Sequence, residues 1–238
     1  MLKRVLTTVG LIGVLLAGCD GAPSASVSPT LEIAPQDFVV LPCGEMSGDR
    51  PCALAVAGGK RVMFGAPAGA TQVFSAADLR LLDAVFVFSL RARDLEGLDE
   101  LRNQSWRAGR ATPLLVIGPN GIEEVIEALN KTFEQSDALR IVEEGIPPGG
   151  YDAAVMTARA ASQGQTVFDT GDVQVRAARA GYNMLYNGTA RLEFRNCDRA
   201  GETVIDPSTV EKQVKIGCDA AQADAVWPLV APLVIVKN

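Results

Sequence analysis

The sequence predicts a mixed α/β (α+β) fold in a single domain that spans residues 31–238. Short apolar runs rich in Val and Phe have the length of buried strands, and they alternate with stretches whose apolar residues recur at helical spacing. The predicted domain is long enough for one substantial core, and no linker or internal repeat divides it.

The first half of the domain contains four predicted strands and one short helix. Ser75-Ala76-Ala77-Asp78 has the pattern of a capping box, which predicts that a helix begins there and ends before Leu82. The strands are predicted at residues 38–41, 53–57, 61–64 and 84–88.

A further strand and a longer helix follow. The strand at residues 114–117 is closed by Gly118-Pro119-Asn120-Gly121, a turn-forming sequence. The helix is predicted at residues 122–133, because its apolar residues recur every three or four positions.

The second half is predicted to form another set of strands, at residues 173–177, 182–186 and 190–195. Asn187-Gly188 lies between the last two and is the preferred two-residue hairpin turn. A helix is expected near residues 220–230, before a final strand at 233–236. Two sets of strands with helices interspersed fit two sheets that pack between helices.

The N-terminus has the pattern of an export signal. Lys3 and Arg4 precede a short apolar stretch, Val5 to Leu16, which is too brief for an ordinary membrane span. Leu16-Ala17-Gly18-Cys19 then matches the bacterial lipobox. We expect residues 1–18 to be a signal peptide and Cys19 to be the lipid-modified, palmitate-bearing first residue of a mature lipoprotein. The alternative is a plain secretory signal with a chance cysteine.

Residues 19–30 are expected to form the lipidated cysteine and a flexible tether, because Gly21 to Thr30 are rich in Gly, Ser, Pro and Ala. The predicted location is therefore a cell membrane, with the domain anchored by lipid at the periplasmic face. Asp20 favours the inner membrane, and the outer membrane is the alternative.

Four cysteines remain after Cys19, and an even number in an exported chain indicates disulfides. Of the three pairings, we favour the local one, Cys43 with Cys52 and Cys197 with Cys218, which closes the smallest loops. Zinc binding by the four thiolates is the alternative, but no C-x-x-C spacing supports it.

The charge of the chain argues against a nucleic-acid partner. The full sequence has 22 basic and 28 acidic residues. Loss of Lys3 and Arg4 with the signal peptide leaves 20 basic against 28 acidic residues, a net charge of −8. Such a surface repels phosphate backbones.

The segment Phe86 to Leu98 reads FVFSLRARDLEGL. It resembles the signature of the metallo-β-lactamase superfamily, in which an apolar strand runs into His-x-His-x-Asp-His and then a helix that opens with Gly-Leu. In an ungapped reading, Ser89, Arg91 and Asp94 occupy the three His positions and Arg93 occupies the Asp position. The whole chain contains no histidine, the usual nitrogen ligand of zinc and the usual general base near neutral pH.

Two more segments carry the resemblance. Residues 103–121, NQSWRAGRATPLLVIGPNG, are similar to the "SW-x-AGR-x-x-PL-x-VYGP-x-G" segment of ribonuclease Z-like and arylsulfatase-like members. Residues 63–69, MFGAPAG, are similar to their "LFDAGPG" turn, with Gly65 in place of Asp. With less similarity downstream, Glu143 and Glu144 fall where close relatives carry His-His-Gly, and Asp198 falls near a strand-end Gly-Asp-Thr.

The resemblance implies an αββα metallo-β-lactamase-like sandwich, shortened in its C-terminal half. In an active relative, the signature ligands help to hold two metal ions that activate water. Every signature ligand has changed here, so we expect a degenerate member with no metal, no other cofactor and no catalytic residue. We use the term vestigial site for the corresponding positions: Ser89, Arg91, Arg93, Asp94, Glu143, Glu144 and Asp198.

Several interpretations of the vestigial site stay open. The guanidinium groups of Arg91 and Arg93 could have replaced the metal cations and neutralised the carboxylates, or the loop could be ordinary charged surface. The same arginines could bind a small anionic ligand. A carboxylate-only calcium or magnesium site is opposed by the two arginines, and Ser89 has no histidine to activate it.

The helix after the signature is expected to present Asp99, Glu100 and Arg102 on a solvated face, and Trp106 is expected to pack this helix onto the sheet. The leading functional hypothesis is a non-catalytic, membrane-anchored pseudoenzyme that binds a periplasmic protein partner or acts as a scaffold. The first alternative is a hydrolase with a metal-free or carboxylate-based site on the same fold. The second is binding of a small anionic ligand through Arg91 and Arg93.

Overall fold

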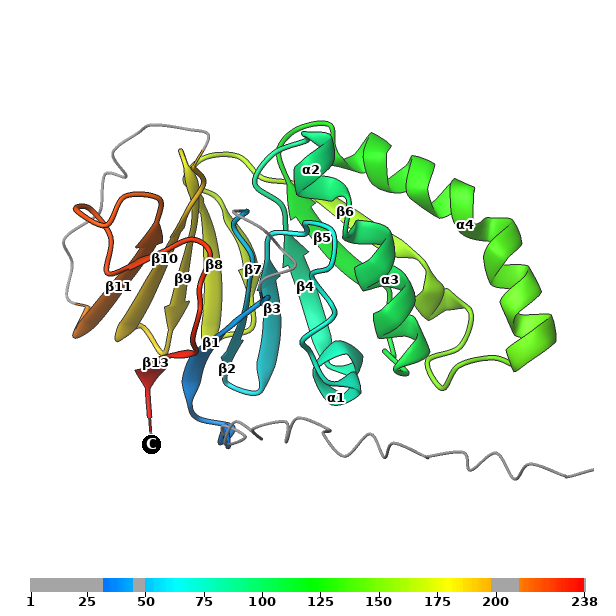
Figure 1. Ribbon diagram of the computed structural model, residues 1–238, viewed down its shortest axis with the longest axis horizontal. Coiled ribbons are helices and arrows are strands. Elements are labelled where there is room, and N and C mark those ends of the chain that lie inside the picture. The colour runs from blue at the N-terminus through cyan, green and yellow to red at the C-terminus, as the bar shows by residue number, and fades with distance from the viewer. Residues whose placement is uncertain (1–31, 45–49, 198–209, 238) are drawn as a thin grey trace, which may run out of the picture. The chain divides into compact units, whose positions relative to one another are not determined.

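Two β-sheets and a layer of helices make up the folded unit that begins at Ile33 (Figure 1). The computed structural model describes residues 32–44, 50–197 and 210–237. The predicted lipidation site Cys19, the tether and the vestigial-site position Asp198 lie outside these ranges.

The first sheet has seven strands in the order β13-β1-β2-β3-β4-β5-β6. Strands β3 to β6 are parallel to one another, and β1 has the same direction because it pairs antiparallel with β2, which pairs antiparallel with β3. We call the edge where β1 and β3 to β6 begin the amino end of the first sheet, and the opposite edge its carboxyl end. The strands are β1 (Phe38–Pro42), β2 (Ala53–Ala57), β3 (Lys60–Phe64), β4 (Leu82–Phe86), β5 (Leu114–Gly118), β6 (Met156–Ala160) and β13 (Leu233–Val236).

The second sheet has six strands in the order β12-β11-β10-β9-β8-β7. Strands β7 to β10 are antiparallel, whereas β11 and β12 run parallel to β10. Asn187 and Gly188 have positive φ angles of 50° and 68°, as the predicted two-residue hairpin turn requires. The strands are β7 (Thr166–Asp169), β8 (Val173–Ala178), β9 (Gly181–Tyr186), β10 (Ala190–Arg195), β11 (Lys212–Gly217) and β12 (Ala225–Val226).

The main core lies between the two sheets. Alternate residues of each strand face the opposite sheet, because successive side chains of a strand point to opposite faces. Phe64 and Phe86 of the first sheet pack with Tyr182 and Phe194 of the second, and the rings of Phe64 and Phe194 stack with centroids 3.7 Å apart.

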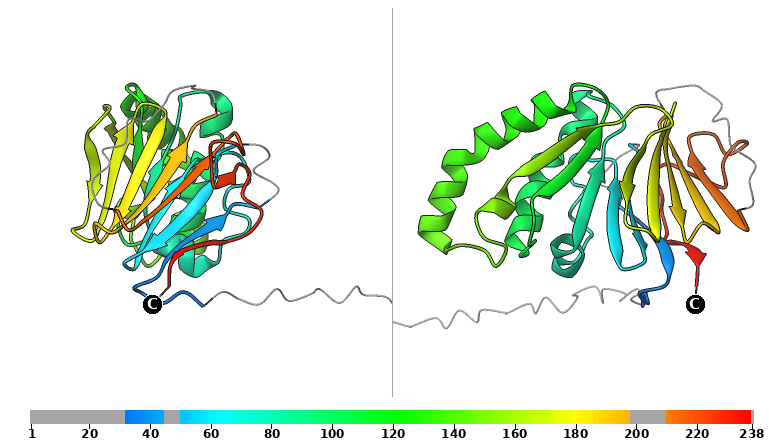
Figure 2. Two further views of the ribbon diagram at one scale, coloured as in Figure 1. Left: turned by 90° about the vertical axis from the view of Figure 1, so that its left-hand side faces the viewer. Right: turned by 180° about the vertical axis from the view of Figure 1, so that it is seen from behind.

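The helices cover the outer face of the first sheet (Figure 2). They are α1 (Ala76–Arg80), α2 (Ala92–Leu95), α3 (Leu98–Arg107) and α4 (Ile122–Glu144), and a 3₁₀ turn, η2, spans Asp152–Ala154. The predicted capping box at Ser75 and Asp78 is confirmed at the start of α1. Helix α4 starts at the carboxyl end of β5 and returns to the amino end of the sheet, where the chain goes on to β6.

Among the residues that the structure describes, no helix has the length and apolar character needed to cross a membrane.

The predicted mixed α/β class and the two sheets are confirmed, and four details differ. Residues 220–230 form turns and β12 instead of a helix. The backbone N–H of Trp227 donates to the Gly217 carbonyl and so extends the second sheet beyond β11. Helix α4 continues to Glu144, and the strands β6, β7 and β11 were not predicted. Within the described ranges, no helix covers the outer face of the second sheet, where polar side chains such as Arg176 and Asn183 alternate with the core residues.

Both local disulfides are present, so the predicted pairing is confirmed. Cys43–Cys52 joins the end of β1 to the start of β2, with Cα atoms 5.6 Å apart. Cys197–Cys218 joins the ends of the parallel strands β10 and β11, with Cα atoms 5.4 Å apart. The alternative of a four-thiolate zinc site is therefore wrong.

Candidate functional site

The signature segment lies at the carboxyl end of the first sheet, where β4 ends and α2 begins. The Ser89 hydroxyl donates a short hydrogen bond to the Asp94 carboxylate, and the Arg91 N–H donates to the Ser89 hydroxyl at 3.2 Å. Asp94 is buried, with 7% of its surface exposed. The structure therefore brings together Ser89, Arg91 and Asp94 of the vestigial site through one local network.

The guanidinium beside Asp94 belongs to Arg50, which the sequence analysis did not single out. Its NH1 atom lies 3.8 Å from Asp94 Oδ1, and both side chains are largely buried. The side chains of Arg91 and Arg93 are exposed at the start and in the last turn of α2. Arg50 lies two residues before the disulfide-bonded Cys52, but nothing in the sequence spacing indicated that it faces Asp94.

Glu143 and Glu144 do not belong to this cluster, which corrects their assignment to the vestigial site. Helix α4 has 23 residues and so extends for about 34 Å from its start near the signature segment. Both residues lie in its last turn, at the amino end of the sheet. There Glu144 lies 3.5 Å from Arg107 and 3.8 Å from Arg140.

Aromatic side chains fill the space between the sheets next to the signature segment. The Tyr182 hydroxyl donates to the Val87 carbonyl at 2.8 Å, and the rings of Phe88 and Tyr182 lie 5.5 Å apart. The cavity that remains has a volume of about 70 Å³, and its wall also includes Pro119 and Asn196. Strand alternation predicted that Tyr182 faces the core, but its position beneath the signature depends on how the two sheets pack.

This donor set does not fit a metal ion. Asp94 is the one carboxylate that the described residues bring to the signature, and it already accepts from Ser89 and lies near Arg50. Oxygen-seeking cations need several converging oxygen ligands, and zinc sites need histidine, cysteine or carboxylate ligands. Across the described ranges, no three His, Cys, Asp or Glu side chains group so that they could hold a metal.

Gly65 stands at the position where the resembled LFDAGPG turn has Asp. Gly65 has a φ of 90°, which favours glycine, and a Cβ atom at this position would overlap the carbonyl oxygen of Pro51. An aspartate therefore cannot replace Gly65 without movement of the backbone that precedes β2.

Glu100 and Arg102 of α3 do not lie on the solvated face that was expected for them, which corrects that expectation. Glu100 accepts hydrogen bonds from the Gly69 N–H and the Thr71 hydroxyl. Arg102 is fully buried and pairs with Asp137 of α4, and its guanidinium lies 5.1 Å from the centre of the Phe133 ring. The segment thus uses its charges to fix α3 against its neighbours.

Two more groups of the family-like segment at residues 103–121 have structural roles. Trp106 is buried, as expected, but it packs with Ala153 and Ala154 instead of the sheet, and its indole N–H donates to Gly150. Burial, followed by the charge of Arg102, lowers the pKa of Arg110 to about 10.

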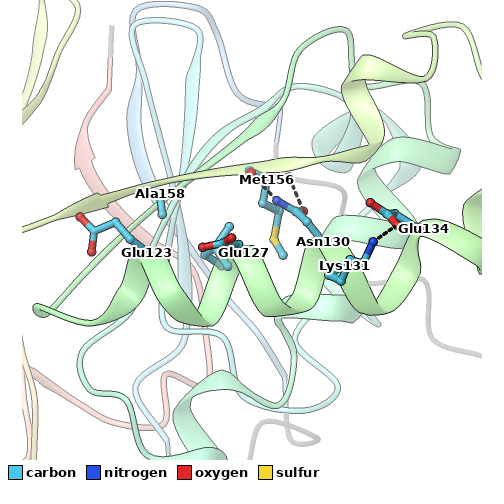
Figure 3. Close-up of a pocket in the computed structure, with 8 residues that line it drawn as sticks. Glu123, Glu127, Asn130, Lys131, Glu134, Met156 and Ala158 are labelled. Carbon is cyan, nitrogen blue, oxygen red and sulfur yellow. Dashed lines mark hydrogen bonds and ion pairs between the residues drawn. The ribbon is translucent and has the colours of Figure 1, made fainter.

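A second candidate is the groove between α4 and the edge strand β6, with a volume of about 470 Å³ (Figure 3). The Asn130 side chain points at β6 and bonds both the N–H and the carbonyl of Met156, and Glu123 accepts from the Ala160 N–H. Lys131 forms an ion pair with Glu134, which raises the pKa of the lysine. These contacts cap the exposed edge of the sheet, a device that prevents unwanted strand pairing.

No family model and no curated protein matches the chain. Solved structures that are similar include the metallo-β-lactamase fold protein YhfI from Bacillus subtilis, with 13% identity, 68% of this chain and 63% of that chain covered, and a TM-score of 0.48. Human tRNase Z, short form, is similar with 13% identity and a TM-score of 0.47, and the match covers 68% of this chain and 70% of that chain. Zinc-bound PqqB from Methylobacterium extorquens has 15% identity, 69% and 64% coverage and a TM-score of 0.44.

Proposed function

We propose that the protein is a lipid-anchored, non-catalytic binding or scaffolding protein at the periplasmic face of a cell membrane. In this proposal, the position of a former metal site has become a structural junction between β4, α2 and the second sheet. The lipobox at Leu16 to Cys19 supports the anchor, and the two disulfides fit an oxidising compartment.

The observation that carries the proposal is the network around Asp94. Ser89 donates to its carboxylate and the Arg50 guanidinium lies close to it, so that a buried negative charge is satisfied by neighbours that are not metals. Next to the signature segment, Phe88 and Tyr182 line a small cavity of about 70 Å³.

Metal content and hydrolytic activity test the non-catalytic half. Full-length protein purified after growth with added zinc, iron or manganese should hold no stoichiometric metal. It should also leave phosphodiester, β-lactam and aryl-sulfate substrates untouched. About one or two ions per chain, with turnover that a chelator abolishes, would contradict the proposal, since two such ions activate water in the metal-dependent reaction.

Intact-mass and tryptic-peptide mass spectrometry of membrane-extracted protein test the anchor. The proposal expects a mature chain that begins at Cys19 with acyl chains attached. The matched control is Cys19→Ala, which cannot carry the acyl chains. This variant should either keep its uncleaved signal peptide or be released from the membrane fraction without acyl mass. A wild-type N-terminus at another residue without lipid would refute the anchor.

A metal-free hydrolase is the second candidate, and the hydrogen bond between Ser89 and Asp94 is the observation that favours it. A carboxylate can orient a serine hydroxyl, although a nucleophilic serine ordinarily needs a general base of suitable pKa. If any substrate in the screen turns over, Ser89→Ala should abolish that turnover. Activity that survives in Ser89→Ala would rule out this candidate.

A further inference from the structure

Exposed apolar side chains gather at the amino end of the first sheet. On α4, Val142 is 84% exposed and Leu139 is 61% exposed, and Ile146 is 61% exposed just after the helix ends. Leu139 and Val142 are three residues apart, so they are neighbours on the outer side of the helix. Tyr151 precedes η2 and β6, and Leu81 lies between α1 and β4, so both exposed side chains belong to the same end.

The folded unit also begins at this end. Strand β1 runs parallel to β3, β4 and β5, so its first residue, Phe38, lies at the amino end of the sheet. Because α4 runs back along the sheet from the carboxyl end, its last turn lies at the same end as the start of β1 (Figures 1 and 2). The signature segment lies at the opposite end.

The distance across this end is comparable to the reach of the predicted tether. From β1 to β6 there are five strand spacings, or about 24 Å, and a helix layer adds about 10 Å. The 14 residues from Cys19 to Glu32 span at most about 46 Å when fully extended, and about 20 Å on average if they are flexible. A bilayer that holds Cys19 can therefore contact the whole amino end.

We propose that Leu139, Val142, Ile146 and Tyr151 form a second membrane contact, which rests on the bilayer that holds the lipid anchor. This inference depends on the proposed lipidation of Cys19. It goes further because it assigns a surface and an orientation: the amino end of the first sheet faces the lipid, and the signature end points into the periplasm.

The chemistry of the surface suits the lipid interface. Aliphatic side chains enter the acyl boundary and a tyrosine places its ring there with its hydroxyl in the headgroup region. Beside the last turn of α4, the two positive charges of Arg107 and Arg140 are balanced by the two negative charges of Glu143 and Glu144, so the contact should depend little on salt. Four side chains bind a membrane weakly by themselves, but the tether keeps the surface at high effective concentration.

Quenching of tryptophan fluorescence by brominated lipid tests the orientation. Native Trp106 and Trp227 are buried, so their background should change little. The full lipidated chain carrying Val142→Trp is placed in phosphatidylcholine vesicles with brominated acyl chains. We expect about a twofold loss of its added emission, because interfacial side chains reach about 5–10 Å into the boundary region. The matched variant Leu90→Trp, at the signature end, should keep its emission.

A second variant provides an independent test. Leu139→Glu in the Val142→Trp background should remove most of the quenching, while vesicle flotation stays unchanged. If wild-type protein does not float with vesicles, the lipid anchor itself is absent. If it floats but both tryptophan variants are quenched alike or not at all, the anchor stands and the second contact is refuted. A third outcome would also refute the second contact. If brominated lipid does not quench Val142→Trp, but its emission shifts to the blue as more protein is added to unbrominated vesicles, a second copy of the chain covers this surface.

Discussion

The Ser89–Asp94–Arg50 network should stabilise the fold instead of serving catalysis, and mutation can measure this. Asp94→Ala removes the acceptor of the Ser89 hydroxyl and leaves the largely buried Arg50 without that carboxylate. A hydrogen bond to a charged group contributes about 1.5–3 kcal/mol. The attraction across 3.8 Å is partly offset by desolvation of both charges, so we expect a total loss of about 2–3 kcal/mol.

The assay is urea unfolding followed by circular dichroism, with calorimetry as a second measurement. A loss of about 2–3 kcal/mol lowers the melting temperature of a unit of this size by about 4–12 °C. Ser89→Ala should lower the free energy of unfolding by about 1–2 kcal/mol. The double variant Ser89→Ala, Asp94→Ala should lose less than the sum of the two single variants, because each of them removes the same hydrogen bond. The control Glu96→Ala, which is exposed just after α2, should stay within about 0.5 kcal/mol of the wild type.

Unchanged or higher stability of Asp94→Ala would refute the reasoning. That result is typical of a charge held in an unfavourable position for function, since active-site residues are often kept at the expense of stability. It would move the metal-free hydrolase from second to first candidate.

Three further predictions concern the framework. Arg102→Met should lower the free energy of unfolding by about 3–5 kcal/mol, measured with urea, because it leaves Asp137 buried without its partner. The double variant Arg102→Met, Asp137→Leu should recover much of that loss. Equal stability of the single variant and the wild type would contradict this prediction. Gly65→Ala should reduce the yield of folded protein or lower its melting temperature, because the new Cβ overlaps Pro51, whereas Gly59→Ala has no such neighbour. Removal of the Cys197–Cys218 pair by alanine should cost about 2–4 kcal/mol, and non-reducing peptide maps should recover only local linkages.

The mixed α/β class, the positions of nine strands and the hairpin turn at Asn187-Gly188 followed from local sequence, whereas β6, β7 and β11 did not. Periodicity and turn-forming residues report on a few neighbours along the chain, and these determine backbone conformation. The disulfide pairing was also predicted, because short loops limit which cysteines meet. The predicted helix at residues 220–230 was wrong, since pairing of β12 with β11 overrode the local pattern.

Burial of the charged residues could not be read from the sequence. Arg102, with its polar neighbours Asp99 and Asn103, has the spacing of a solvated helix face, yet Asp137, 35 residues later on α4, meets Arg102 in the interior. The long reach of α4 likewise carried Glu143 and Glu144 away from the signature, whereas a comparison of short motifs had suggested that they belong to it.

The sequence by itself determined which residues stand at the signature positions, because side-chain identity alone shows that they differ from the His and Asp residues of the family that the segment resembles and that the chain has no histidine. Only the tertiary structure decided what occupies that place. Arg50 and Tyr182 come from distant parts of the chain, and their contacts with Asp94 and Val87 depend on how the loop before β2 and the second sheet pack against β4. Packing of this kind depends on the whole core, so the sequence on either side of each residue does not reveal it.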